Sequence, residues 1–469
     1  MKFIVNKILP FVGFFIAFVV WSNTSVSGYE WYFIVPLLFS IYVLLDSDIY
    51  ERAYNNIGFA IFFLTAVLRY LLTPLIASLS GYSTLFGFLP SSQEYREAVD
   101  LIIYEEVAVF ALLYYLKNKY YRRNFYLTNT IEMSQGIGRK PLFVFMCMLA
   151  VLTVTVFPQM CANIHFAGNL SDIDLSKTIV VDLPFAGVFT EILSLGRLLG
   201  VLLVIDYLWR RSQTTQSYKM AILVSVAVIM LNASFVTNLS RFGIIVPIIS
   251  YTYLLMSLYR RQKGLIVTTM FSIVLGVVVV MSAVKFFSED RNASNYESND
   301  VNFWGDTMQM YFMGVKETAV GVRAEDQVDL VYSGNNFMLF LNDTFSNVIG
   351  LSNFTESRIN TVHLYNYVYF PRGTSVSQIP PNVINGLYYF GRWAAPLYTL
   401  FFVYLFAFLD YKAQHCKRIV DKFALLYGAL YCSLCMMING AMLCSFLVND
   451  TLILLLYSKL NYFVLKKSR

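Results

Sequence analysis

The chain has 469 residues, of which 57% are hydrophobic, 17% aromatic and only 14% charged, and its formal net charge is +6. Soluble domains carry about 25% charged residues, so this composition excludes a water-soluble globule of this size. The basic residues stand in short patches beside apolar stretches, which is typical of membrane proteins and argues against nucleic acid as a partner.

Apolar stretches of about 20 residues recur along the chain, and each is long enough to cross roughly 30 Å of hydrocarbon. They predict an all-α, polytopic integral membrane protein of about 12 transmembrane helices with one large external loop. The predicted spans are 3–21, 31–46, 57–76, 98–116, 141–161, 184–208, 220–237, 242–259, 264–284, 386–409, 422–440 and 443–463. They divide the chain into a transmembrane region 1–284, a loop 285–385 with short helices, and a second transmembrane region 386–469.

The basic clusters fall on one side of this arrangement: they precede the first span, follow the fourth, sixth, eighth and tenth, and end the chain. The positive-inside rule then places both termini in the cytoplasm and the loop 285–385 outside. A connection of this length predicts an ordered functional element rather than a linker. Within it, NNFMLFLNDTFSNVIG predicts an amphipathic helix at the membrane interface.

Several ionisable residues fall inside predicted spans, where they cost several kcal/mol unless they are paired or face a cavity. They are Arg69, Glu105, Glu106, Glu191, Arg197 and Asp450. Each is a functional candidate, with structural ion pairing as the alternative interpretation. Glu191 and Arg197 share one span but lie six residues apart, so we expect each to pair with another helix.

Arg241 lies in TNLSRFGIIVPI, at a sharp predicted turn on the outer side. There its guanidinium either binds a phosphate in a bidentate manner or is a topological stop that reaches the headgroups.

Residues 371–393, PRGTSVSQIPPNVINGLYYFGRW, lead into the tenth predicted span on the outer side. The double proline blocks helix propagation, and Asn382 is expected to cap the helix that follows. Gly386 and Gly391 allow a close backbone approach. A helix start beside Arg372 and Arg392 predicts an anion site, and the expected anion is phosphate.

No motif for metal or nucleotide binding is present, so no cofactor and no metal site are expected. Cys432 and Cys435 form a C-x-x-C pair, which we interpret as two small residues of a transmembrane helix.

The architecture, TNLSRFGIIVPI and PPNVINGLYYFGRW together resemble the Wzy-type polymerases of bacterial surface polysaccharides, which are similar to the O-antigen ligases. Arg323 and Gly334 also fit the R-x10-G spacing of external loops in some of these enzymes. The resemblance implies a GT-C-like glycosyltransferase of the bacterial inner membrane that works without a metal. Its substrate would be an undecaprenyl-diphosphate-linked oligosaccharide in the outer leaflet of the membrane, where the protein also contacts membrane lipid. Its partners would be a flippase and a chain-length regulator of the same pathway.

The resemblance also implies roles for outward residues. Arginines would stabilise the diphosphate leaving group, and His363 or an acid of the loop (Glu325, Asp326 or Asp329) would activate the acceptor hydroxyl. The expected catalytic residues are Arg241, Arg323, His363 and Arg372. The expected substrate-binding residues are Glu191, Arg197, Arg358, Asn382, Tyr388, Tyr389 and Arg392. Two alternatives stay open: a flippase or other transporter of lipid-linked oligosaccharide, and an O-antigen ligase.

Overall fold

The computed structural model describes most of the chain as helices in two compact units. The residues it does not describe are 1, 3, 25, 83–87, 122–136, 138–140, 162–163, 167–184, 238–240, 271, 273–275, 277–300, 333–335, 346–347, 349–359, 371–377 and 468–469. The side chains of 121, 164–166, 236–237, 241–242, 244, 332 and 465–467 are also outside the description. Unit 1 comprises Met1–Leu127, Tyr296–Tyr411 and Ala429–Phe446; unit 2 comprises Thr128–Asn295, Lys412–Gly428 and Leu447–Arg469.

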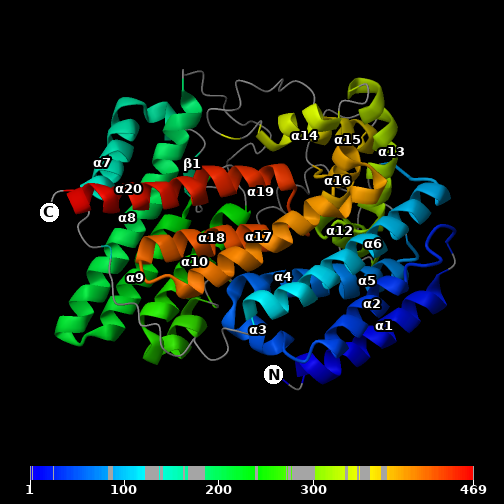
Figure 1. The fold of residues 1–469 in the computed structure, drawn as a ribbon, viewed down its shortest axis with the longest axis horizontal. Helices are drawn as coiled ribbons and strands as arrows, with labels where there is room; N and C mark the ends of the chain where they lie inside the picture. Colours follow the sequence, from blue (N-terminus) through cyan, green and yellow to red (C-terminus); the bar gives the residue numbers. More distant parts are fainter. Residues whose placement is uncertain are drawn as a thin grey trace. The chain divides into compact units, whose positions relative to one another are not determined.

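Unit 1 joins the N-terminal helices to most of the predicted external loop. Its helices are α1 (Leu9–Asn23), α2 (Ile34–Leu45), α3 (Ile49–Asn55), α4 (Ile57–Val67), α5 (Thr73–Leu79), α6 (Ser92–Leu116), α12 (Val301–Tyr311), α13 (Val315–Tyr332), α14 (Asn336–Phe345), α15 (Thr361–Tyr369), α16 (Asn382–Phe390), α17 (Pro396–His415, to Tyr411) and α19 (Gly440–Phe446). Within this unit, α12 packs against α5, and α13 packs against α6, α15 and α16 (Figure 1).

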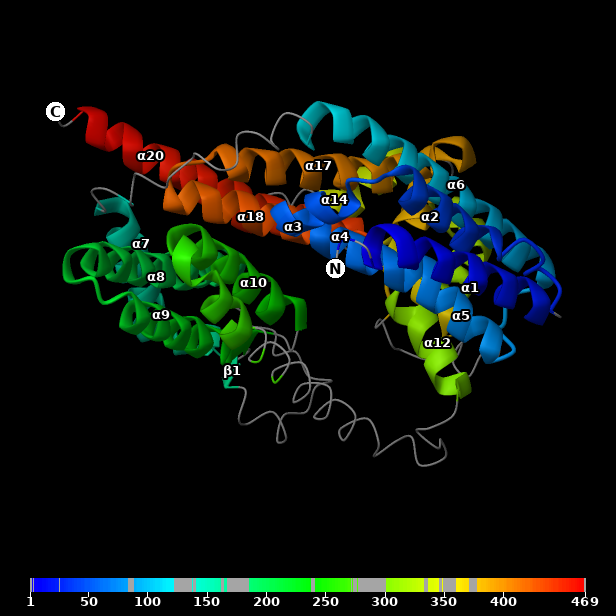
Figure 2. The ribbon, with the colours of Figure 1, turned by 90° about the horizontal axis from the view of Figure 1, so that it is seen from below.

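Unit 2 is a smaller helical group with one short β-ribbon. Its helices are α7 (Pro141–Val156), α8 (Ala186–Thr215), α9 (Tyr218–Ala233), α10 (Arg241–Leu258) and α20 (Ile453–Lys467). The helix α18 (Ile419–Ser433) belongs to it as far as Gly428. The helices α7, α8 and α9 lie side by side in sequence order (Figures 1 and 2). The strands β1 (Ile164–Phe166) and β2 (Phe235–Thr237) pair antiparallel, with His165 opposite Val236.

The helical membrane class is confirmed, because nine apolar helices of the described residues overlap nine of the predicted spans. Five are long and apolar enough to cross a membrane: Ile4–Asn23, Ile57–Leu79, Ala186–Thr215, Arg392–His415 and Gly440–Val464. Four are shorter apolar helices: Ile34–Leu45, Pro141–Val156, Tyr218–Ala233 and Ile245–Leu258. Predicted spans 98–116 and 422–440 correspond to parts of α6 and α18, and most of 264–284 lies outside the described residues. The count of twelve spans and the orientation stay predictions.

The predicted span at 386–409 begins later than the sequence indicates. The helix α16 ends at Phe390, Gly391 adopts φ +75°, and α17 begins only at Pro396. The left-handed backbone of Gly391 favours glycine because a Cβ is strained there, and it turns the chain between the two helices. The predicted close approach at Gly386 is confirmed, since a Cβ there would overlap the backbone carbonyl of Ala395.

The expectation that Asn382 caps α16 is wrong. The residue at the cap position is Pro381, which makes no side-chain cap hydrogen bond, and Asn382 is the first residue inside the helix. Its side chain makes tertiary contacts instead, because the double proline sets the helix start one residue earlier.

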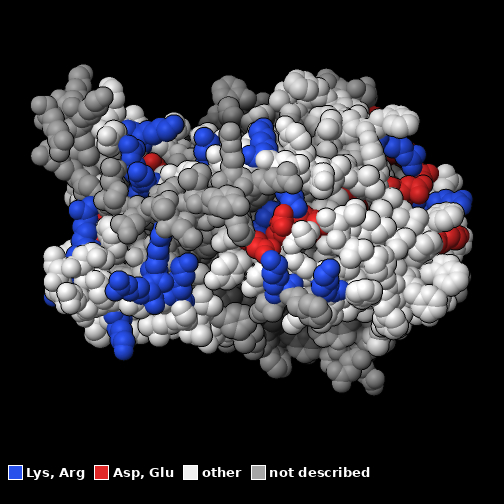
Figure 3. Space-filling model, turned by 60° about the horizontal axis from the view of Figure 1, so that its bottom comes forward, with Lys and Arg blue, Asp and Glu red and all other residues white. Residues whose placement is uncertain are grey.

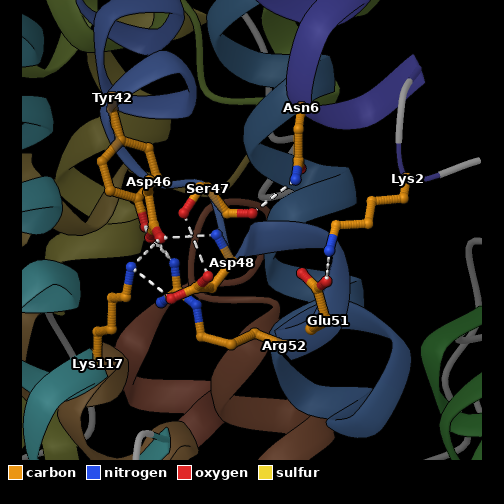
Figure 4. A network of polar contacts seen from close by, with 9 residues as sticks. All are labelled: Lys2, Asn6, Tyr42, Asp46, Ser47, Asp48, Glu51, Arg52 and Lys117. Atoms are coloured by element: carbon orange, nitrogen blue, oxygen red, sulfur yellow. Dashed lines mark hydrogen bonds and ion pairs between the residues drawn. The ribbon is translucent and has the colours of Figure 1, made fainter.

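Charged side chains tie together the α2–α3 turn and the end of α6 (Figure 4). Asp46 is fully buried, pairs with Arg52 and accepts a hydrogen bond from the Lys117 ammonium at 2.7 Å. The same ammonium lies 2.8 Å from Asp48. Because these charges are paired with one another, we assign them a structural role.

Lys and Arg side chains gather in several groups on the face that Figure 3 shows, with acidic side chains beside some of them. This surface agrees with the net positive charge of the chain.

Candidate functional site

The described part of 285–385 is held together by buried carboxylates and tyrosines. Glu317 is 1% exposed and accepts hydrogen bonds from the Tyr365 hydroxyl at 2.6 Å and the Tyr369 hydroxyl at 3.1 Å. Lys316 binds Asp306 at 2.5 Å. Burial raises the pKa of the Glu317 carboxyl, while its hydrogen bond from Tyr365 and the charge of Lys316 oppose that rise. The described part of this segment therefore contains buried carboxylates that are paired with a lysine or with tyrosine hydroxyls.

Asp343 connects α14 with α15 and with α16, the helix that follows the segment. From α14 it accepts hydrogen bonds from the backbone and hydroxyl of Thr361, the first residue of α15. It also accepts one at 2.7 Å from the hydroxyl of Tyr389 on α16. The first turn of α15 is therefore fixed to the buried side of the segment.

His363 lies on that first turn, and its side chain is exposed. Asn360 caps the helix: its Oδ1 accepts from the backbone N–H of His363 at 2.9 Å and lies 2.6 Å from the ring Nδ1. In the sequence, Arg358 and Arg372 flank α15 on either side, and both lie outside the described residues. An imidazole with one oriented nitrogen is the side chain best suited to transfer a proton near neutral pH.

The structure brings Arg323 and Arg392 together on one face of α6. Arg323 Nε lies 3.7 Å from Glu94 Oε1, and Arg392 Nη2 lies 2.8 Å from Glu97 Oε2. The two glutamates are three residues apart, which places them on the same face of the helix. Both arginine side chains are more than half exposed, at 53% and 56%, whereas the glutamate side chains are 15% and 28% exposed. The guanidinium groups are therefore open to an anionic ligand from solution while their carboxylate partners lie partly buried.

Glu325 also belongs to this surface. Its pKa is raised to about 6, mainly by burial and by the charge of Asp329, and Arg392 opposes the rise. The cluster of Arg323, Arg392 and Glu325 therefore places two guanidinium groups near a carboxyl group whose pKa is about 6.

A second group of charges is buried between helices of the predicted spans in unit 1. Arg69 Nη2 donates to Glu105 Oε2 at 2.6 Å, and Thr399 donates to Glu105 Oε1 at 2.5 Å. The neighbouring Glu106 is fully buried, and neither of its carboxylate oxygens has a hydrogen-bond partner among the described residues. Arg69 itself lies in the wide π-helical turn Leu68–Leu72, a geometry that is frequent at functional sites.

Three predicted substrate-binding residues of α16 are buried and hydrogen-bonded within unit 1. The Asn382 amide donates to the carbonyls of Cys435 and Ile438 and accepts from the Gly440 N–H at 2.6 Å. The Tyr388 hydroxyl donates to the Gly321 carbonyl at 2.7 Å, and the hydroxyl of Tyr389, as described above, binds Asp343. All three side chains are buried.

Four further residues singled out from the sequence belong to unit 2: Glu191, Arg197, Arg241 and Asp450. Arg197 Nε donates to the Asn232 amide oxygen on α9 at 3.2 Å, so its pairing with another helix is confirmed. Glu191 Oε2 has no hydrogen-bond partner among the described residues. Asp450, in a π-helical turn of its own (Leu447–Leu452), accepts from Ser194 at 3.2 Å. Arg241 is the first residue of α10, and its side chain is outside the description.

Sequence reasoning missed Asn360 and Asp343, the two residues that fix the surroundings of His363. The available signal for Asn360 was its helix-capping residue type three positions before the histidine. Asp343 carries no local signal, because its partners lie 18 and 46 residues away.

Among the described residues, no group of His, Cys, Asp and Glu side chains is arranged to hold a metal ion. In comparisons with known proteins, no family model, no curated protein and no solved structure matches the chain.

Proposed function

We propose that this protein polymerises polyprenyl-diphosphate-linked oligosaccharide repeat units into O-antigen or capsular polysaccharide. The reaction would take place at the outer face of the bacterial cytoplasmic membrane, on a GT-C-like scaffold, without a metal. The supporting sequence features are the many apolar spans and the two segments that resemble Wzy-type polymerases.

The observation that carries the proposal is the arrangement of α12–α16 in unit 1. These five helices are not among those long and apolar enough to cross a membrane, yet α12 packs on α5, α13 and α16 pack on α6, and α14 and α15 pack on α16 and α13, respectively. They carry the exposed His363, whose ring is oriented by Asn360. Arg323 of α13 and Arg392, at the start of the next span, are exposed and pair with glutamates of α6. A reaction between two lipid-anchored sugars needs a proton acceptor and cations on such a layer above the apolar helices.

The chemistry follows from these groups. A hydroxyl of one lipid-linked unit attacks the anomeric carbon of the growing chain, and the bond from that carbon to the diphosphate breaks. Arginines at the surface stabilise the charge that develops on the leaving diphosphate. The hydroxyl proton passes to a base, for which His363 has the required exposure and a fixed orientation.

A flippase of lipid-linked oligosaccharide is the second candidate, favoured by one specific observation. Arg69 and Asp450 each lie in a π-helical turn inside a predicted span, and intramembrane charges often mark transport pathways. The O-antigen ligase shares the proposed chemistry and differs in its acceptor.

The test is the surface glycolipid profile of a strain that lacks this protein. A polymerase predicts glycolipid capped with a single repeat unit, whereas complete absence of repeats favours the flippase or the ligase. Arg241→Ala and Arg372→Ala should each reproduce the single-repeat profile at normal membrane abundance. Arg211→Ala, an exposed arginine of the predicted cytoplasmic side, is the matched control and should leave chain length unchanged. Wild-type chain lengths in both test variants would contradict the assignment of these arginines.

A further inference from the structure

The contact between Asn360 and His363 determines which ring nitrogen carries the proton. The backbone N–H of His363 can only donate, so the Asn360 atom that faces it at 2.9 Å must be the carbonyl oxygen Oδ1. The same oxygen lies 2.6 Å from Nδ1 of the ring. Because a carbonyl oxygen only accepts, Nδ1 must be the donor. In the neutral imidazole, Nε2 then bears the unshared electron pair.

Neighbouring contacts keep this arrangement in place. Thr361, between Asn360 and His363, binds the carboxylate of Asp343 through its backbone and its hydroxyl. Asp343 is 3% exposed and also accepts from Tyr389. The cap residue and the ring therefore stand on a turn that is anchored to two other helices, which is the kind of support that keeps a functional side chain in one geometry.

We propose that Asn360 is a positioning residue that holds His363 in the Nδ1–H tautomer, so that its exposed Nε2 accepts the proton of the attacking sugar hydroxyl. The role as proton acceptor rests on the proposed function, whereas the tautomer does not. In this step the hydroxyl O–H bond breaks, the oxygen forms the new bond to the anomeric carbon, and the diphosphate leaves with the electron pair of the broken bond. The proton moves to Nε2 and is later released to water.

The tautomer is measured directly in the full-length protein in lipid nanodiscs with 15N-labelled histidine. The chain contains only three histidines, so the signal of His363 is identified by its loss in His363→Gln. We expect a protonated Nδ1 and an unprotonated Nε2 in the wild type. A protonated Nε2 in the neutral ring would overturn the proposal.

Two substitutions of Asn360 separate positioning from helix capping. Serine is as good an N-cap as asparagine, but its shorter side chain does not hold the ring, so Asn360→Ser should keep the fold and give a mixture of tautomers. Aspartate offers an oxygen to both donors, so Asn360→Asp should keep the Nδ1–H tautomer.

Polymerisation of a purified lipid-linked repeat unit supplies the functional readout. His363→Gln should lower the rate by about 10²–10⁴-fold, the usual contribution of a general base. Asn360→Ser should lower it by about 10-fold, which is less than the loss of the base itself, and Asn360→Asp should restore most of the rate. An unchanged rate in Asn360→Ser despite mixed tautomers would overturn the positioning role. A normal rate in His363→Gln would overturn the assignment of His363 as the base. It would not affect the proposed function, which the glycolipid profile of the deletion strain tests separately.

Discussion

Glu105 and Glu106 are adjacent, fully buried glutamates of α6 with opposite surroundings, and this contrast gives a sharp prediction. Glu105 holds Arg69 at 2.6 Å and Thr399 at 2.5 Å, whereas Glu106 has no hydrogen-bond partner among the described residues. In Glu105→Leu, Arg69 would remain buried without its hydrogen-bonded carboxylate, and its Nε and Nη1 already lack hydrogen bonds among the described residues. Breaking a buried pair in this way costs about 3–5 kcal/mol. In Glu106→Leu, the Arg69–Glu105 pair stays intact, so we expect a change within about 1 kcal/mol of zero or a gain in stability.

The free energy of unfolding of the two variants can be compared in mixed micelles titrated with a denaturing detergent. Adding Arg69→Met to Glu105→Leu replaces the whole pair by apolar groups, and this double variant should recover most of the lost stability. Equal destabilisation by Glu105→Leu and Glu106→Leu would refute the assignment of partners. Failure of Arg69→Met to restore stability would show that an unpaired guanidinium is not the cause of the loss.

Two further predictions concern the glycines of helices and the acid of the arginine cluster. Gly386→Ala should destabilise the protein by about 1–3 kcal/mol in the same unfolding titration, because the added Cβ overlaps a backbone carbonyl. The control is Gly200→Ala, which has open space around the added Cβ. It should be neutral or stabilising by up to about 1 kcal/mol. Glu325 has its pKa raised from 4.5 to about 6 in the folded protein, so its contribution to stability is complete below pH 4.5 and is lost as the pH rises through about 6. Glu325→Gln should remove that loss, and an identical pH dependence of the unfolding midpoint in variant and wild type would contradict the assignment.

The apolar helices were predictable because hydropathy over about 20 residues is a strong signal that needs no partner. The start of the tenth predicted span shows where that signal stops. The stretch from Asn382 to Leu409 is apolar almost throughout, so hydropathy reads one continuous helix. The break depends on the positive φ of Gly391 and on the missing N–H of Pro396, and both residues also occur inside transmembrane helices.

The partners of buried polar residues were not predictable from the sequence. Tyrosines such as Tyr388 and Tyr389 occur both on sugar-binding surfaces and in protein cores. Which of the two applies depends on which other helices pack against α16. The structure covers it with α13 and α14, and both hydroxyls then find acceptors inside the protein. The same holds for Glu105, whose partners lie 36 and 294 residues away.

The Asn360–His363 contact is an intermediate case. Asparagine at an N-cap binds the backbone N–H three residues on, so its side chain necessarily faces the residue at that position. A histidine there, in a rotamer that turns toward the helix start, brings Nδ1 to the same oxygen. Both residue types and their spacing are visible in NTVH. What the sequence lacked was the position of the helix start, because Thr361 and Val362 are β-branched and have low helix propensity. The start is instead set by the hydrogen bonds of Thr361 to Asp343, so a contact across 18 residues determines a local tautomer.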